Sequence, residues 1–182
     1  MLSEKLKLDE IDKQIITLVQ EDPGLTHTQI AEQINRSQPT VGMRIKKLEK
    51  SGILQFQPGI NFKRVEDIYL AVVQVNAKNP DEIIDMAKYC PFMLNAFRVS
   101  GEHNLCILLS SSNLSKLDNV VNYHFRQNPD ATNVSMEIVT EIAKDFVLPI
   151  DFSTEEQDPT LEEGCGEKCR YKIAKTLQET KI

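Results

Sequence analysis

Basic side chains concentrate between residues 36 and 64, where they could bind the phosphates and base edges of DNA. This stretch holds seven Lys and Arg residues against one acid, a formal charge of +6. Residues 1–35 carry three bases and seven acids (−4), and residues 65–182 carry eleven bases and nineteen acids (−8), so the chain totals −6. Affinity for phosphate depends on local basic density more than on total charge. The acidic total is therefore compatible with a nucleic-acid partner.

The elements around this basic stretch are predicted to be the helices of a helix-turn-helix. Apolar residues at helical spacing behind Asp9, an acceptable N-cap, predict a first helix over residues 9–21. Thr26 and Gln29 have the spacing of a capping box and predict the start of a second helix. Ser37 is the expected N-cap of a third, recognition helix over residues 37–50. Its buried stripe is expected to consist of Val41, Ile45 and Leu48.

The outward side of the recognition helix carries the candidate DNA contacts. In a helix-turn-helix this helix enters the major groove, and its N-terminal half reaches the base edges. Arg44 is expected to contact guanine and Gln38 adenine, while the Lys side chains and the helix N-terminus hold phosphates. The candidate residues are Arg36, Ser37, Gln38, Thr40, Met43, Arg44, Lys46, Lys47 and Lys50. The alternative interpretation is a solvated basic helix in a plain three-helix bundle.

The remainder of the chain predicts a second domain of a different kind. Residues 53–62, broken by Pro58-Gly59, predict a short hairpin or wing. After them, strands and helices alternate in the order β-α-β-β-α-β, which is the ferredoxin-like plan with two helices on one face of an antiparallel sheet. The expected ranges are strand 68–75, helix 80–89, strand 93–100, strand 105–109, helix 114–127 and an extended segment over 134–147. The other sheet face is commonly covered by a second copy of the chain.

Five segments of the sequence resemble the Lrp/AsnC family of feast/famine regulators. They are Leu8-Asp-Glu-Ile-Asp-Lys-Gln-Ile, Gln29-Ile-Ala-Glu-Gln-Ile, the run from Ser37 to Glu49, Ser51-Gly-Ile-Leu and Arg98-Val-Ser-Gly-Glu. With the β-α-β-β-α-β order, the resemblance covers residues 8–147. It implies a homodimer built through the sensor sheets, further assembly into tetramers or octamers, and control of transcription by amino acids or related small molecules.

The turn after residue 100 is the candidate effector site. The family's hairpin usually reads Gly, an acid, an aromatic residue and Asp, whereas here it reads Gly-Glu-His-Asn. Asn104 lacks the charge that could pair with the ammonium group of an amino acid. Backbone N–H groups exposed at tight turns suit carboxylates, although an ordinary β-turn would have the same residues. The candidate residues are Ser100, Gly101, Glu102, His103 and Asn104.

A pair of tail cysteines, Cys165 and Cys169, leaves three interpretations open. Two thiolates could contribute to a zinc or iron–sulfur site, with two tails meeting across a dimer axis to supply the four ligands such sites require. The pair could instead form a reversible disulfide, or the tail could be flexible and carry neither function. No cofactor is otherwise expected. Cys90 and Cys106 lie in apolar surroundings and are predicted to be buried.

These features predict an α+β protein with a winged helix-turn-helix domain and a ferredoxin-like sensor domain. The expected division is 1–53 (DNA binding), 54–66 (linker and wing strand), 67–150 (sensing and oligomerisation) and 151–182 (an extension that begins as a linker and ends as a short helix).

The predicted function is operator binding that a small-molecule effector modulates. The expected partners are pseudo-palindromic double-stranded DNA, the effector and a second copy of the chain. No apolar run approaches the ~20 residues of a membrane span, so a cytoplasmic, nucleoid-associated location is expected. Metal or redox sensing through the tail is the alternative. An enzyme is not expected, because the sequence has no Gly-rich phosphate loop, nucleophile elbow or metal-binding His pair.

Overall fold

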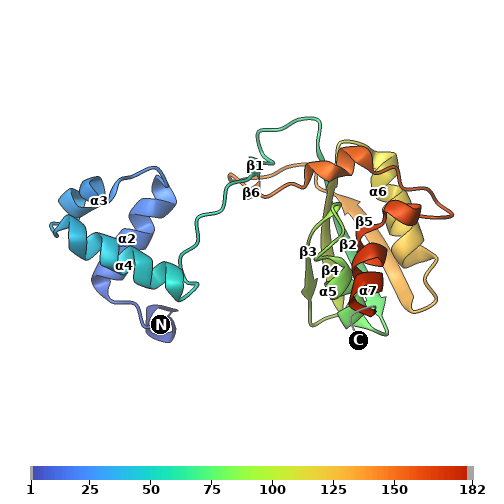
Figure 1. Cartoon of the computed structure of the whole chain (residues 1–182), viewed down its shortest axis with the longest axis horizontal. Helices are drawn as coiled ribbons and strands as arrows, with labels where there is room; N and C mark the ends of the chain where they lie inside the picture. Colours follow the sequence, from blue (N-terminus) through green and yellow to red (C-terminus); the bar gives the residue numbers. More distant parts are fainter. Residues whose placement is uncertain (1, 180–182) are drawn as a thin grey trace. The chain divides into compact units, whose positions relative to one another are not determined.

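The computed structural model describes residues 2–179, and the chain divides into two compact units (Figure 1). The first unit is Met1–Gln57 and the second is Pro58–Ile182. The division falls inside the segment 54–66 that the sequence predicted as a linker. None of the described helices is long and apolar enough to cross a membrane.

The N-terminal unit contains the three predicted helices. They are α2 (Glu10–Glu21), α3 (His27–Gln33) and α4 (Gln38–Lys50), and a short α1 (Leu2–Lys5), which the sequence did not predict, precedes them. The predicted caps are confirmed, because the side chains of Asp9, Thr26 and Ser37 accept bonds from the backbone N–H groups at N3 of their helices. The buried hydrophobic residues of this unit form one cluster, which consists of Ile15, Val19, Ile30, Ala31, Val41, Ile45, Leu48 and Leu54.

The hairpin predicted for residues 53–62 is not formed. Instead, β1 (Ile60–Asn61) pairs antiparallel with β6 (Val147–Leu148), with Ile60 opposite Leu148. The predicted turn residue Gly59 has another role, because a Cβ there would lie 2.4 Å from the carbonyl oxygen of Leu148. Glycine thus permits the close approach of two backbones that are far apart in sequence.

The second unit has the predicted ferredoxin-like sheet. Four antiparallel strands lie in the order β3-β4-β2-β5, which the β-α-β-β-α-β connectivity requires. They are β2 (Tyr69–Ala77), β3 (Met93–Arg98), β4 (Leu105–Ser111) and β5 (Ala131–Ile138). The extended segment predicted over 134–147 was placed too late, since β5 begins at Ala131 and ends before the short β6.

One face of this sheet carries the core of the unit. Alternate residues of β2 and β4, such as Val73 and Ile107, are fully buried on that face. They pack in one cluster with residues of α5 (Pro80–Met86), α6 (Leu114–Val121) and the π-helical turn η1 (Asn122–Arg126) that continues α6. The helices predicted over 80–89 and 114–127 are therefore confirmed, with the last turn of the second in π-helical form.

The tail was predicted to begin as a linker, and this expectation is wrong. Residues 152–156 form a short 3-10 helix, Gln157 and Pro159 are buried, and the backbone carbonyls of these two residues accept bonds from α6 side chains. A second 3-10 turn, η3 (Gly166–Lys168), leads into α7 (Arg170–Glu179), which lies beside α5 (Figure 1). This packing could not be predicted from the polar composition of the segment, because only a few apolar residues anchor it to the sheet unit. The last part of the predicted helix, residues 180–182, lies outside the described residues.

We expect a Gly164→Ala substitution to release the tail from the sheet unit. Gly164 has φ +59, and a Cβ there would lie 2.6 Å from the ring of Tyr123 in η1. The ring and the tail backbone would have to separate. Hydrogen–deuterium exchange of α7 in the full chain should therefore become much faster.

Gly166→Ala is the matched control for this substitution. Gly166 has a similar φ of +55, but a Cβ there would meet only the Glu163 carboxylate, at 3.8 Å. The two variants share the backbone strain of about 1 kcal/mol for a left-handed L-residue and differ in the clash. Equal exchange of α7 in both variants would show that the Tyr123 contact does not hold the tail.

Candidate functional site

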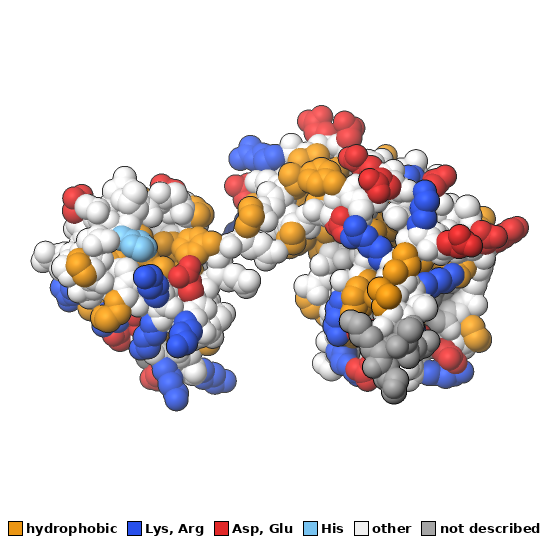
Figure 2. Space-filling model, viewed as in Figure 1, with side chains coloured by type: hydrophobic (Ala, Val, Ile, Leu, Met, Phe, Trp, Pro, Cys, Tyr) orange, Lys and Arg blue, Asp and Glu red, His pale blue; other side chains and the backbone are white. Residues whose placement is uncertain are grey.

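The helix α4 presents a polar and basic side opposite its buried stripe. Val41, Ile45 and Leu48 are at most 5% exposed, as predicted. Gln38, Met43, Lys46, Lys47 and Lys50 are exposed, and Met43 reaches 66% exposure. Figure 2 shows blue Lys and Arg side chains gathered on the visible side of this unit. We call the exposed residues Gln38, Met43, Lys46, Lys47 and Lys50 the α4 outer face.

Two backbone features allow α3 and α4 to lie close together, namely the turn before α4 and a glycine within α4. Asn35 adopts φ +52, a left-handed conformation that Asn tolerates better than most residues. Gly42 of α4 lies against α3, and a Cβ there would come within 3.2 Å of Nδ1 of His27. The absence of a side chain at residue 42 thus allows the tight packing of the helix pair.

The N-terminal residues of α4 are partly used by the helix itself. The Ser37 hydroxyl caps Thr40 N–H at 3.4 Å and lies 2.7 Å from the Thr40 hydroxyl. Thr40 is half-buried, so it offers less to a base edge than the sequence suggested. Arg36 is exposed, with its guanidinium donating to the carbonyl of Asn35 at 2.8 Å.

Arg44 has a different environment from the one predicted. Its guanidinium contacts two carboxylates at the start of α2, at 2.6 Å from Asp9 and 2.8 Å from Asp12. The Arg44 side chain is 23% exposed and that of Asp12 only 6%. The expectation that Arg44 contacts guanine is therefore not supported, because the side chain already bridges α4 to α2.

The electrostatics of this cluster are consistent with a structural role. The hydrogen bond from Arg44 lowers the pKa of Asp9 below its usual range, and the same bond raises the pKa of Arg44. A carboxylate as buried as that of Asp12 costs free energy unless it is paired. Sequence reasoning missed the pairing, because Asp9 was read only as an N-cap and Asp12 lies 32 residues from its partner.

The predicted effector turn is a hydrogen-bonded junction. The Asn104 side-chain amide accepts from Ala77 N–H at 2.9 Å and donates to the carbonyl of Ala77 at 2.8 Å. It therefore pairs with the backbone at the end of β2, as a neighbouring strand would. Asn76 donates to the carbonyl of Glu102 at 2.9 Å. Ser100, Gly101 and Glu102 are exposed, and His103 is half-buried. Asn104 is thus occupied by hydrogen bonds within the fold, whereas residues 100–102 remain exposed.

The tail cysteines lie in an apolar environment. Cys169 is 7% exposed within the sheet core, and Cys90 and Cys165 pack against the same cluster. Burial raises the pKa of Cys165 to about 11 and that of Cys90 to about 12. No group of three or more His, Cys, Asp or Glu residues among 2–179 is arranged to hold a metal ion. Reactive sensor thiols have a lowered pKa and are accessible, so this environment does not favour sensing.

Replacing Arg44 with Ala should destabilise the N-terminal unit by about 1–3 kcal/mol, because the Asp12 carboxylate would remain buried without its partner. Lys46→Ala is the control, since an exposed side chain on the same helix should change stability by less than about 0.5 kcal/mol. Native-state hydrogen exchange of α2 and α4 in the full chain measures both. An Arg44→Ala protein that is as stable as the control but fails to bind DNA would restore Arg44 as a base-reading residue.

Alkylation of Cys165 by iodoacetamide should be slow at neutral pH and accelerate with pH. Only the thiolate reacts, and a pKa of about 11 in place of 9.0 lowers the thiolate fraction at pH 8 about 100-fold. The rate should therefore rise about tenfold per pH unit up to pH ~11. Peptide mass spectrometry follows the reaction, with the urea-unfolded chain as control. Equal rates in the folded and unfolded chains at pH 8 would contradict a half-buried thiol with a raised pKa.

The comparisons with known proteins agree with both units. A winged helix-turn-helix DNA-binding family model matches residues 8–55. The HTH-type transcriptional regulator PH0140 of Pyrococcus horikoshii is 29% identical over 146 residues, which are 78% of this chain and 92% of that protein.

Solved structures share the two-domain fold. AsnC of Escherichia coli superposes with a TM-score of 0.61 at 15% identity, over 77% of this chain and 97% of that chain. Transcriptional regulator NMB0573 of Neisseria meningitidis, solved as a complex with L-Met, superposes with a TM-score of 0.66 at 22% identity, over 80% of this chain and 98% of that chain. Together these likenesses show a winged helix-turn-helix DNA-binding domain over residues 8–55 and the two-domain fold of AsnC, and the chain is similar to HTH-type transcriptional regulators.

Proposed function

We propose that the chain reads a pseudo-palindromic operator as a homodimer and that a small-molecule effector modulates this binding. The observation that carries the proposal is the α4 outer face, where side chains suited to phosphates and bases stand exposed opposite a buried apolar stripe. This side of the helix makes no core contacts, so its composition is explained best by a polyanionic partner. Binding to the chromosome would place the protein in the cytoplasm.

The structure changes which residues we assign to base reading. Gln38 and Lys47 are exposed donors on α4, and Met43 offers an apolar contact for a thymine methyl group. Arg36, Lys46 and Lys50, with the N–H groups near Ser37, suit phosphates. Arg44 supports this face from behind through its ion pairs with α2.

The open face of the sheet is the proposed dimer interface. Val73 and every second residue of β2 on either side of it face the core. Val72 and Gln74, which lie between them, therefore face the opposite side of the sheet. In register, Val72 lies opposite Leu108, and Gln74 opposite Cys106, which in turn pairs with Phe97. Phe97 is 46% exposed. An exposed apolar sheet face is a liability for a monomer, so we propose that a second copy covers it, with assembly into tetramers or octamers built on that dimer.

The proposed effector is an amino acid or a related metabolite. The L-Met complex of the Neisseria meningitidis regulator supports this class of ligand for a protein of the same fold. The accessible backbone of residues 100–102, with the Glu102 carboxylate, is the proposed contact surface. Asn104 is held by Ala77, so its contribution would be to position the turn.

Metal or redox sensing through Cys165 and Cys169 is the weaker candidate. Both thiols pack in the hydrophobic cluster of the sheet unit, and burial raises the pKa of the Cys165 thiol, as expected of cysteines that serve packing. The operator affinity of the wild-type chain should therefore be insensitive to peroxide and to chelators, and Cys165→Ser with Cys169→Ser should not change this response.

Lys50→Ala should weaken DNA binding and lower its salt dependence. Removing one ion pair between a lysine and a phosphate is expected to reduce the slope of log K against log salt by about 0.9. The full chain would first select its operator from a random-sequence duplex library, and that duplex would then be titrated at several salt concentrations. Lys78→Ala, an exposed lysine in the sheet unit, is the charge-matched control. An unchanged slope for Lys50→Ala would contradict DNA binding through α4.

The same titration tests the effector. Each of the common amino acids, L-Met first, is added at millimolar concentration to the wild-type chain and to Glu102→Gln. A ligand that binds one assembly state better must shift operator affinity. Affinity unchanged by every amino acid would reject this ligand class while leaving DNA recognition intact.

A further inference from the structure

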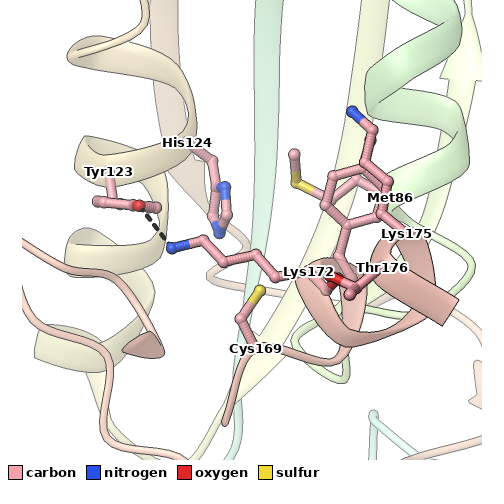
Figure 3. Close-up of a pocket in the computed structure, with 8 residues that line it drawn as sticks. Met86, Tyr123, His124, Cys169, Lys172, Lys175 and Thr176 are labelled. Atoms are coloured by element: carbon pink, nitrogen blue, oxygen red, sulfur yellow. Dashed lines mark hydrogen bonds between the residues drawn. The ribbon is translucent and has the colours of Figure 1, made fainter. Parts of the chain in front are cut away.

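A cavity of about 430 Å³ lies where the tail packs against the helices that cover the sheet (Figure 3). Met86 enters it from α5, Tyr123 and His124 from η1, and Cys169 and Lys172 from the tail. Figure 3 shows these side chains converging on one space from three elements. The volume is within the range of about 300–1,000 Å³ usual for small-molecule sites. The cavity exists only because the tail is docked.

The cavity is electropositive inside an acidic part of the protein. Lys172 Nζ donates to the Tyr123 hydroxyl at 3.0 Å and lies 5.3 Å from the centre of that ring. Lys175 Nζ lies 5.5 Å from the centre of the Tyr171 ring and 3.4 Å from Glu82. Of the described residues that line this cavity, none carries a carboxylate. Residues 65–182 nevertheless have a formal charge of −8, so the two ammonium groups stand out.

The imidazole in the cavity is neutral at physiological pH. Burial, with a further contribution from the charge of Lys172, lowers the pKa of His124 to about 4. His124 therefore offers a neutral ring to a ligand. Both lysines are cationic at this pH, because their pKa values are raised further above the ordinary lysine value, that of Lys172 by its hydrogen bond to Tyr123 and that of Lys175 by Tyr171 and by its bond to Glu82.

The rest of the lining is apolar. Met86 is 7% exposed, Tyr171 8% and Cys169 7%. A ligand that filled this space would place carbon atoms against these side chains and a negative charge at the lysines. A bare inorganic anion would leave the apolar surface unused, and a neutral hydrocarbon would leave the charge of Lys172 without an opposite charge, because Lys175 is already paired with Glu82.

We propose that this cavity is a binding site for small organic carboxylates with an aromatic or branched apolar body. The carboxylate lies at the Lys172 ammonium group beside Tyr123, the apolar body lies against Met86 and Tyr171, and Lys175 adds positive charge at the rim. Because the ligand contacts both the tail and α5, it binds only the docked tail and stabilises that state. This site is distinct from the turn at residues 100–104 and does not depend on DNA recognition.

Phenylacetate is the probe for the test, with phenylacetamide and acetate as comparison compounds. Saturation-transfer NMR and titration calorimetry on the full chain should detect phenylacetate and show at least about tenfold weaker binding of the other two, as expected when one charged hydrogen bond or the apolar body is removed. Lys172→Gln with Lys175→Gln should weaken phenylacetate by a similar factor. Lys168→Gln, an exposed lysine in η3 outside the cavity lining, should not.

The Lys172→Gln, Lys175→Gln variant could lose binding merely because its tail is released. A cavity-filling substitution therefore provides a second test that does not change these lysines. Thr176 is an exposed residue on the cavity wall, so Thr176→Phe should block phenylacetate without changing any charge, while α7 keeps its slow hydrogen exchange. The proposal is overturned if phenylacetate does not bind at millimolar concentration. It is equally overturned if neither the double variant nor Thr176→Phe weakens binding, or if phenylacetamide binds as well as phenylacetate.

Discussion

Burial of one face of the antiparallel sheet organises the whole second unit. Val73, Val75, Ile107 and Leu109 alternate inward on the two central strands and are completely buried. Side chains of this size contribute roughly 1.5–3 kcal/mol each when buried, so the elements that cover them are strongly specified. The helices α5 and α6 cover part of this face, and the tail adds Tyr171 and Cys169 to the same cluster. The extension is therefore a covering element of the core.

In the N-terminal unit the corresponding constraint is electrostatic, because a buried charged group needs a partner of opposite charge. Asp12 lies at the interface between α2 and α4, and the positive group available to it is Arg44 on the recognition helix. The unit thus uses a cation that a simple count of basic residues would give to DNA. In the proposed function, recognition would fall to side chains that neither the core nor α2 engages, which are Gln38, Met43 and the lysines after residue 45. One side of α4 would then serve stability and the other side recognition.

Periodicity and capping in the sequence were sufficient to predict the helices and the order of the sheet elements. A helix cap depends on contacts within four residues, so a short window of sequence is enough to predict it, as for Asp9, Thr26 and Ser37. Apart from the short α1 and the late placement of β5, the failures involve long-range partners. Ile60 pairs with Leu148 instead of forming a hairpin, and Arg44 pairs with Asp9 instead of remaining exposed. The polar segment 151–163 read as a linker, because the apolar anchors that hold the tail, Cys169 and Tyr171, come after it in sequence.

The two ligand sites proposed for the sheet unit share a physical connection. The turn is tied to Ala77 through the Asn104 amide, and Ala77 lines a second cavity of about 350 Å³ beneath α5. That cavity shares Met86, Tyr123 and His124 with the cavity at the tail. Contiguity alone does not couple two sites; coupling requires an element with two states that both ligands bias. The tail would be such an element if it exchanged between a docked and a released state, since Gly164 and Tyr123 hold the docked tail at the wall that both cavities share. In that case a carboxylate under α7 would favour the docked tail and so reach the packing next to Ala77 without touching the turn itself.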